Sequence, residues 1–91
     1  MVIYVNELKV ENFEIDGKMN VIVPEEFGGE LSSISREIFK IIAGFCLYSG
    51  NYEIIGENFH ALLDNNQIDF DRRVVKAILE LKEKEYIEVS I

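Results

Sequence analysis

Three cations, Arg72, Arg73 and Lys76, stand close together near the end of the sequence, in DFDRRVVKAILELKEKEYIEVSI (residues 69–91). On the first turns of a helix, arginine can bond guanine edges and lysine can bind phosphates in the major groove of DNA. The same side chains could bind a partner protein. They could also form a solvated face paired with nearby aspartates, because a helix N-terminus favours anions. The sequence leaves these three interpretations open.

A second group of candidate residues is acidic. Carboxylates gathered on one surface can imitate the phosphates of nucleic acid and steer a basic partner protein toward them. Some small phage proteins that inhibit restriction or CRISPR machinery use this device, so charge and size suggest an analogy with anti-CRISPR proteins. The alternative is an ordinary charged surface exposed to water. The candidate acidic partner surface consists of Glu25, Glu26, Glu30, Glu53, Glu57, Asp64 and Asp69.

No pattern in the sequence predicts catalysis, a metal site or a cofactor. His60 is the only histidine and Cys46 the only cysteine, so no Cys/His cluster can form. The segment DNNQIDFD resembles a calcium loop only superficially, because Ile68 stands at the fifth position and Val75 replaces the glutamate at the twelfth. We therefore expect a protein that is not an enzyme.

The overall composition indicates one small acidic domain. The chain has 91 residues, 48% of them hydrophobic, with nine basic and 17 acidic side chains and a net charge of −8. Such a balance disfavours nonspecific binding to nucleic acid or to a membrane surface. The longest apolar run, IIAGFCLY, is too short to span a membrane. With no basic, apolar leader and a single cysteine, we expect a cytoplasmic protein.

The first third of the sequence predicts a β-hairpin. The segment LKVENFEIDGKMNVIV alternates, and Asp16-Gly17 at its middle is a strong signal for a two-residue turn. Val10, Phe13 and Ile15, followed by Val21 and Val23, should supply its buried side. Residues 2–5, VIYV, form a further candidate strand.

A widely apolar helix should follow, from about residue 34 to residue 49, with Ser32 or Ser33 as its N-cap. A helix with so broad an apolar surface is covered on more than one side. It is either the central helix of the fold or, in part, a homodimer interface formed by residues 34–48. The candidate dimer face consists of Ile38, Phe39, Ile42, Phe45 and Cys46.

Two more helices and a strand should complete the chain. A helix is expected over residues 56–64, a turn near 65–70, a third helix from about 70 or 71 to 84, and a strand from YIEVSI. In the third helix, Val74, Val75, Ile78, Leu79 and Leu81 should share the buried face. Lys76–Glu80 and Glu80–Lys84 suit i,i+4 ion pairs on the other face.

From residue 34 to residue 91 this order resembles the winged helix-turn-helix superfamily. GENFHALLDNNQIDFDRRVVKAIL is similar to the helix-turn-helix itself, and VVKAILELKEKEYIEV to the reading helix and the strand after it. The chain departs from the pattern at Glu85, where glycine is usual, and it ends at Ile91 before a second wing strand. We therefore expect the terminal strand to pair with residues 52–55 or with the N-terminal hairpin.

The expected fold is a single α+β domain. Residues 1–31 form a β-hairpin element and loop, and residues 32–91 a winged-helix-like three-helix core, with the C-terminal strand in a small antiparallel sheet. The expected function is a non-enzymatic acidic binding module or regulator, of the kind that phages or mobile elements encode, acting on a protein partner with a basic surface. The alternative is a dimeric winged-helix transcriptional regulator that reads DNA with Arg72, Arg73 and Lys76.

Overall fold

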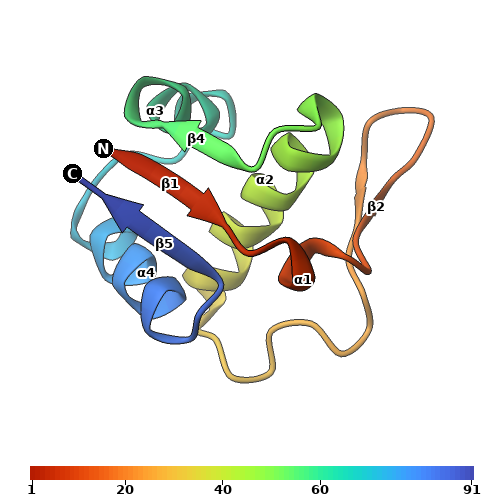
Figure 1. Cartoon of the computed structure of the whole chain (residues 1–91), viewed down its shortest axis with the longest axis horizontal. Coiled ribbons are helices and arrows are strands. Elements are labelled where there is room, and N and C mark those ends of the chain that lie inside the picture. Colours follow the sequence, from red (N-terminus) through yellow and green to blue (C-terminus); the bar gives the residue numbers. More distant parts are fainter.

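A computed structural model describes all 91 residues as an α+β fold with a three-stranded sheet, a separate two-stranded ladder and four helices. In Figure 1, the three-stranded sheet lies in front of the three longer helices, and the two-stranded ladder lies beside the long central helix. Nineteen buried hydrophobic residues form one core cluster. The elements are β1 (Val2–Val5), α1 (Glu7–Val10), β2 (Glu14–Ile15), β3 (Val21–Ile22), α2 (Ser33–Ser49), β4 (Glu53–Ile55), α3 (Gly56–Asn65), α4 (Arg72–Glu83) and β5 (Ile87–Ser90).

The strand at residues 2–5 is confirmed, and it lies at the centre of the main sheet. The strand order is β4-β1-β5, and β1 is antiparallel to both neighbours, with Val2 opposite Ser90 and Tyr4 opposite Glu53. The predicted pairing of the terminal strand is therefore wrong. β5 pairs with β1 and not with β4, since β1 lies between the two.

The N-terminal hairpin forms, but the two-residue turn predicted at Asp16-Gly17 is wrong. The paired residues are Ile15 and Val21, and a longer loop joins them. The Asp16 side chain holds this loop by accepting hydrogen bonds from the backbone N–H groups of Lys18 and Asn20, at 2.8 and 3.0 Å. The strands are short because residues 7–10, predicted as extended chain, form the single turn α1, capped by Asn6.

Part of the buried side predicted for the hairpin is also wrong. Val10 and Phe13 are buried and Val21 packs against the core, but Val23 is exposed. Val23 follows β3, whose last paired residue is Ile22, so no strand holds it against α2. The hairpin thus covers α2 through its first strand and the start of its second.

The central helix is confirmed. α2 begins after its N-cap Ser32 and ends at Gly50, a left-handed residue whose N–H donates to the Cys46 carbonyl. It packs against α4 on one side and against β2 and β3 on another. No helix of the structure, α2 included, is long and apolar enough to cross a membrane.

The candidate dimer face on this helix is not a surface of the folded chain. Its residues Ile38, Phe39, Ile42 and Cys46 are fully buried in the chain's own core, and Phe45 is partly buried. The broad apolar surface of α2 is covered from within, by α4, the sheet and the hairpin. These contacts within one chain account for the broad apolar surface of α2, so no second copy of the chain is needed to cover it.

α3 and α4 lie where the sequence predicts them. Asp71 caps α4 by accepting hydrogen bonds from the N–H groups of Arg73 and Val74. The buried side of α4 consists of Val74, Ala77, Ile78 and Leu81, whereas Val75 and Leu79, predicted to be buried, are exposed. The sheet and α2 cover only one side of α4, so its apolar stripe is narrower than its apolar composition suggests.

Candidate functional site

The predicted acidic partner surface is not one surface in the structure. Glu25, Glu26 and Glu30 belong to the loop before α2, which in Figure 1 runs along the bottom of the molecule. Glu53, Glu57, Asp64 and Asp69 belong to β4, α3 and the turn after it, and α3 lies at the opposite end of the molecule.

Within the first group, Glu30 has a structural role. Its carboxylate accepts a hydrogen bond of 2.7 Å from the hydroxyl of Tyr86. This bond lowers the pKa of Glu30, and burial with the same bond raises the pKa of Tyr86 to about 12. The contact fastens the loop to the end of α4.

A different acidic surface surrounds Tyr4, on the open side of the main sheet. Tyr4 is 42% exposed, and its neighbours across the sheet are Glu53 on β4 and Glu88 on β5. Because residues directly opposite in antiparallel strands point to the same side, these three form one row. We call this surface the Tyr4 face; its members are Tyr4, Glu7, Glu53, Glu85 and Glu88.

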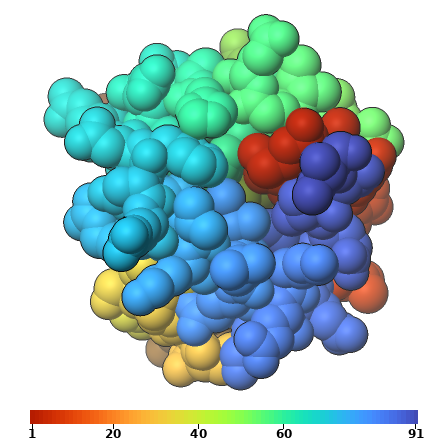
Figure 2. All heavy atoms as spheres, turned by 90° about the vertical axis from the view of Figure 1, so that its left-hand side faces the viewer, coloured from red at the N-terminus to blue at the C-terminus, as the bar shows by residue number.

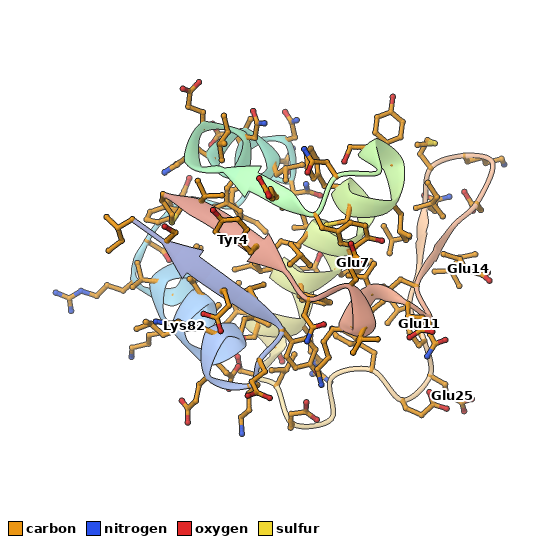
Figure 3. The ribbon with its side chains drawn as sticks, in the orientation of Figure 1. Tyr4, Glu7, Glu11, Glu14, Glu25 and Lys82 are labelled. Atoms are coloured by element: carbon orange, nitrogen blue, oxygen red, sulfur yellow. The ribbon has the colours of Figure 1, made fainter.

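The Tyr4 face is continuous and slightly hollowed. Tyr4, Glu85 and Glu88 line one open hollow of about 310 Å³ together with Asn6. Figure 3 shows Tyr4 and Glu7 on the side of the sheet turned away from the helices, and Glu11 and Glu14 continuing the acidic band toward the hairpin.

No group of the chain forms an ion pair with these carboxylates or donates a hydrogen bond to them. The only carboxylates that accept hydrogen bonds from the chain are those of Asp16, Glu30, Asp71 and Glu80, and the one ion pair is Arg73–Asp71. All members of the Tyr4 face lie outside that set. The face therefore presents free negative charge around an exposed aromatic ring.

Of the candidate cations of α4, Arg73 is paired and the other two are not. Arg73 binds Asp71 with a nitrogen–oxygen distance of 3.0 Å, which raises the pKa of Arg73 and lowers that of Asp71. Arg72 and Lys76 are exposed and form no ion pair. Figure 2 shows this side of the molecule, with α4 in light blue between β5 in dark blue and the start of α2 in yellow.

Two other cations that could extend such a surface lie elsewhere. Arg36 and Lys40 of α2 line a hollow of about 420 Å³ with Glu25, Glu37 and Phe27. That hollow contains no residue of α4.

The predicted i,i+4 ion pairs of α4 are absent because Glu80 is engaged elsewhere. Glu80 accepts hydrogen bonds from the backbone N–H and the hydroxyl of Ser32, at 3.0 and 2.9 Å. Lys76 and Lys84 consequently have no carboxylate within ion-pair distance. The contact removes one glutamate from the outward side of the helix.

Histidine and cysteine are residue types often used in catalysis and metal binding, but His60 and Cys46 have packing roles here. His60 is exposed and stacks on Phe70, with ring centroids 4.5 Å apart. Cys46 is buried, and burial raises the pKa of its thiol to about 12, so the reactive thiolate is disfavoured. No group of three or more His, Cys, Asp or Glu side chains is arranged to hold a metal ion.

The sequence reasoning missed the residues of the Tyr4 face other than Glu53. A usable signal existed, because Tyr4 alternates with the apolar Ile3 and Val5 and should therefore point away from the core. The positions of Glu85 and Glu88 beside it could not be derived, because they depend on β5 pairing with β1.

No known family model, curated protein or solved structure matches this chain. The Tyr4 face and the outward side of α4 both present unpaired charge beside exposed aromatic or aliphatic side chains.

Proposed function

We propose that this chain is a non-enzymatic binding protein that acts through a partner protein with a basic surface, and that the Tyr4 face is the contact. One observation carries the proposal: an exposed tyrosine stands at the centre of an uncovered sheet face, between glutamates that form no ion pair with any group of the chain. Neither a helix nor a loop covers this side of the sheet in Figure 1.

The chemistry of the face fits such a partner. Tyrosine is among the residues that contribute most to protein interfaces, since its ring buries a large area and its hydroxyl can still bond. Unpaired carboxylates around it would accelerate encounter with a cationic surface and discriminate against acidic partners. The net charge of −8 adds a long-range attraction of the same sign.

The class of partner follows from this chemistry. Proteins that handle nucleic acid carry basic grooves, and a small acidic protein can occupy one in place of the nucleic acid. We therefore propose a regulator or inhibitor of such a machine, of the phage or mobile-element kind, in a reducing compartment such as the cytoplasm. The free, buried thiol of Cys46 supports a reducing compartment, because the chain has no disulfide that would need an oxidising one.

The alternative proposal, a dimeric winged-helix regulator that reads DNA, has less support. Arg73 is held by Asp71, and the outward side of α4 carries exposed Val75 and Leu79 beside Arg72 and Lys76. The candidate dimer face is core, so the pairing of reading helices lacks a surface. The winged-helix resemblance of residues 34–91 then concerns the scaffold and not the ligand.

Site-specific photo-crosslinking tests the proposal. A benzophenone amino acid replaces Tyr4, or, as a control, Tyr48, which is 71% exposed at the far end of α2. Each protein is irradiated in extract of the cells that naturally contain it. We expect a protein adduct from position 4 that position 48 does not give, and we expect mass spectrometry to show that the captured protein has a basic groove.

Two charge variants and one DNA measurement complete the test. Glu53→Lys/Glu88→Lys should abolish the adduct from position 4, whereas Glu25→Lys/Glu26→Lys, with the same change in net charge, should keep it. Equal loss in both variants would show that net charge alone is responsible and would contradict the proposal. Salt-sensitive binding of duplex DNA that Arg72→Ala/Arg73→Ala abolishes would establish the alternative.

A further inference from the structure

The outward side of α4 carries a second surface whose chemistry differs from that of the Tyr4 face. At 100° per residue, the direction opposite the buried Val74, Ala77 and Leu81 is occupied by Arg72, Lys76, Leu79 and, at the C-terminal end, Glu83. Val75 and Lys82 stand on one flank of that line. We call Arg72, Val75, Lys76, Leu79 and Lys82 the α4 strip.

The α4 strip exposes aliphatic surface at helical spacing. Val75 is 43% exposed and Leu79 is 59% exposed, and they stand four residues apart on adjacent turns. A single exposed aliphatic residue is ordinary. Here two of them lie on adjacent turns of one helix, with cations before, between and after them along the chain.

The strip is locally basic in an acidic protein. Arg72, Lys76 and Lys82 form no ion pair, and Glu80, which could have neutralised Lys76, is held by Ser32 instead. Glu83 is the one anion on the outward line, and it stands at the C-terminal end. The ligand that complements this pattern is anionic opposite Arg72 and Lys76 and apolar opposite Val75 and Leu79.

We propose that the α4 strip binds an acidic amphipathic helix of a partner protein. Such a helix would bury Val75 and Leu79 against its own apolar stripe and place its flanking carboxylates on Arg72, Lys76 and Lys82. Duplex DNA complements the strip less well, because phosphates satisfy the three cations but leave the two aliphatic side chains against charged groups. The carboxylate of Glu83 would also repel phosphate.

The proposal concerns a different surface from the Tyr4 face, so it does not depend on the function proposed above. A chain with both surfaces could bring an acidic helix and a basic protein together. Loss of binding at α4 would leave crosslinking from position 4 unchanged, and the two proposals can therefore fail separately.

Titrations followed by two-dimensional NMR of the ¹⁵N-labelled full chain test the proposal. The probe is a synthetic helical peptide with leucines at i, i+3, i+4 and i+7 and glutamates on both flanks, beside a scrambled peptide of the same composition. We expect shift changes centred on residues 72–82 with the helical peptide and none with the scrambled one. A salt dependence should accompany them, because part of the attraction is ionic.

Matched exposed variants show whether the strip itself is responsible. Leu79→Ser should lower the affinity for the helical peptide by about tenfold or more. Leu8→Ser, at a leucine 76% exposed on α1, should leave that affinity unchanged. Lys76→Glu should also lower the affinity for the helical peptide, and Lys18→Glu should not. Because all four side chains are exposed, the variants should keep the fold, which circular dichroism can check.

Five results would overturn the proposal, four of them from the titrations. Those four are shifts that centre on other residues, equal shifts with the scrambled peptide, no shifts at millimolar peptide, and shifts over residues 72–82 that duplex DNA produces but the peptide does not. Concentration-dependent shifts of the same residues without peptide would assign the strip to a second copy of this chain and would likewise overturn it.

Discussion

Glu80 of α4 caps the N-terminus of α2 through Ser32, although the two residues are 48 positions apart in the sequence. The Glu80 carboxylate accepts hydrogen bonds from both the backbone N–H and the hydroxyl of Ser32, while the Ser32 oxygen accepts from the N–H of Ser35. In a capping box, a glutamate three residues after the N-cap bonds the N-cap amide. In α2 that position is Ser35, and Glu80 of α4 supplies the carboxylate that bonds the N-cap amide instead.

This contact should couple the stabilities of the two helices. Ser32→Ala removes the hydroxyl that caps α2 and donates to Glu80, leaves the backbone N–H that also donates to Glu80, and should cost about 1 kcal/mol of unfolding free energy. Glu80→Ala should destabilise less, and the double variant should lose less than the sum of the two single changes, because both remove one shared contact. Urea unfolding of the three variants gives the coupling, and Glu83→Ala on the same helix is the control.

The pH dependence of that contact has a definite sign. Hydrogen bonds from the Ser35 hydroxyl and from the Ser32 amide and hydroxyl lower the pKa of Glu80 from its ordinary value of 4.5. Its stabilising effect is therefore complete above pH 4.5 and is lost as the pH falls through the lowered value. Additive losses in the cycle, or an unchanged coupling at pH 3, would contradict the coupled cap.

A second prediction concerns Glu85, at the end of α4. The φ angle of Glu85 is +66°. The N–H of Tyr86 donates to the Leu81 carbonyl at 2.8 Å, and the N–H of Glu85 donates to the Lys82 carbonyl at 3.1 Å. This is the Schellman arrangement, in which glycine normally occupies the left-handed position. Glu85→Gly should therefore raise the unfolding free energy by up to about 1 kcal/mol.

The matched control is two residues earlier. Glu83→Gly places glycine at the last residue of α4, where the backbone is right-handed, and should lower the unfolding free energy by up to about 1 kcal/mol. Thermal or urea unfolding distinguishes the two signs directly. A destabilising Glu85→Gly would mean that the Glu85 side chain makes a contribution larger than the backbone strain it causes.

The sequence predicted α2 and α4 well because local signals mark where both helices begin and where α2 ends. Ser32 caps α2, Asp71 caps α4, and Gly50 ends α2, and all three can be recognised from neighbouring residues alone. The strands were harder. β1 pairs with residues more than 80 positions away in β5, and no local pattern specifies that partner.

The same distinction explains the candidate surfaces. The acidic residues chosen from the sequence come from two separate parts of the chain, residues 25–30 and 53–69, whereas the Tyr4 face gathers its glutamates from α1, β4, β5 and the turn before β5. The exposed positions of Val75 and Leu79 depend on how much of α4 the sheet and α2 cover. Both surfaces are products of tertiary packing, which composition and periodicity do not contain.

A third prediction separates core from surface on α2. The Phe39 ring is fully buried, and its centroid lies 5.8 Å from that of Phe13 and 5.0 Å from that of Tyr86. Phe39→Ala should cost about 3–5 kcal/mol, since it removes these contacts and leaves a cavity. Tyr48→Ala, on the exposed part of the same helix, should change stability by less than about 0.5 kcal/mol. Urea unfolding checks both, and similar losses would contradict the assigned core.

A fourth prediction concerns alkaline pH. Burial raises the pKa of the Cys46 thiol from 9.0 to about 12, so between these values the unfolded chain releases a proton that the folded chain retains. Stability should therefore be complete below pH 9 and fall above it, with a limiting slope of about 1.4 kcal/mol per pH unit for one proton. Tyr86, whose pKa burial and Glu30 raise from 10.0 to about 12, should add to the loss above pH 10.

Two variants assign the protons. Cys46→Ala should lower stability at pH 7 through lost packing, but it should remove the decline between pH 9 and pH 10. Tyr86→Phe should keep that decline and reduce only the part above pH 10. Urea midpoints measured at intervals from pH 7 to pH 11 give these slopes. A wild-type midpoint that stays constant up to pH 10 would show that solvent reaches the Cys46 thiol, and the close packing of α2 at this position would then be wrong.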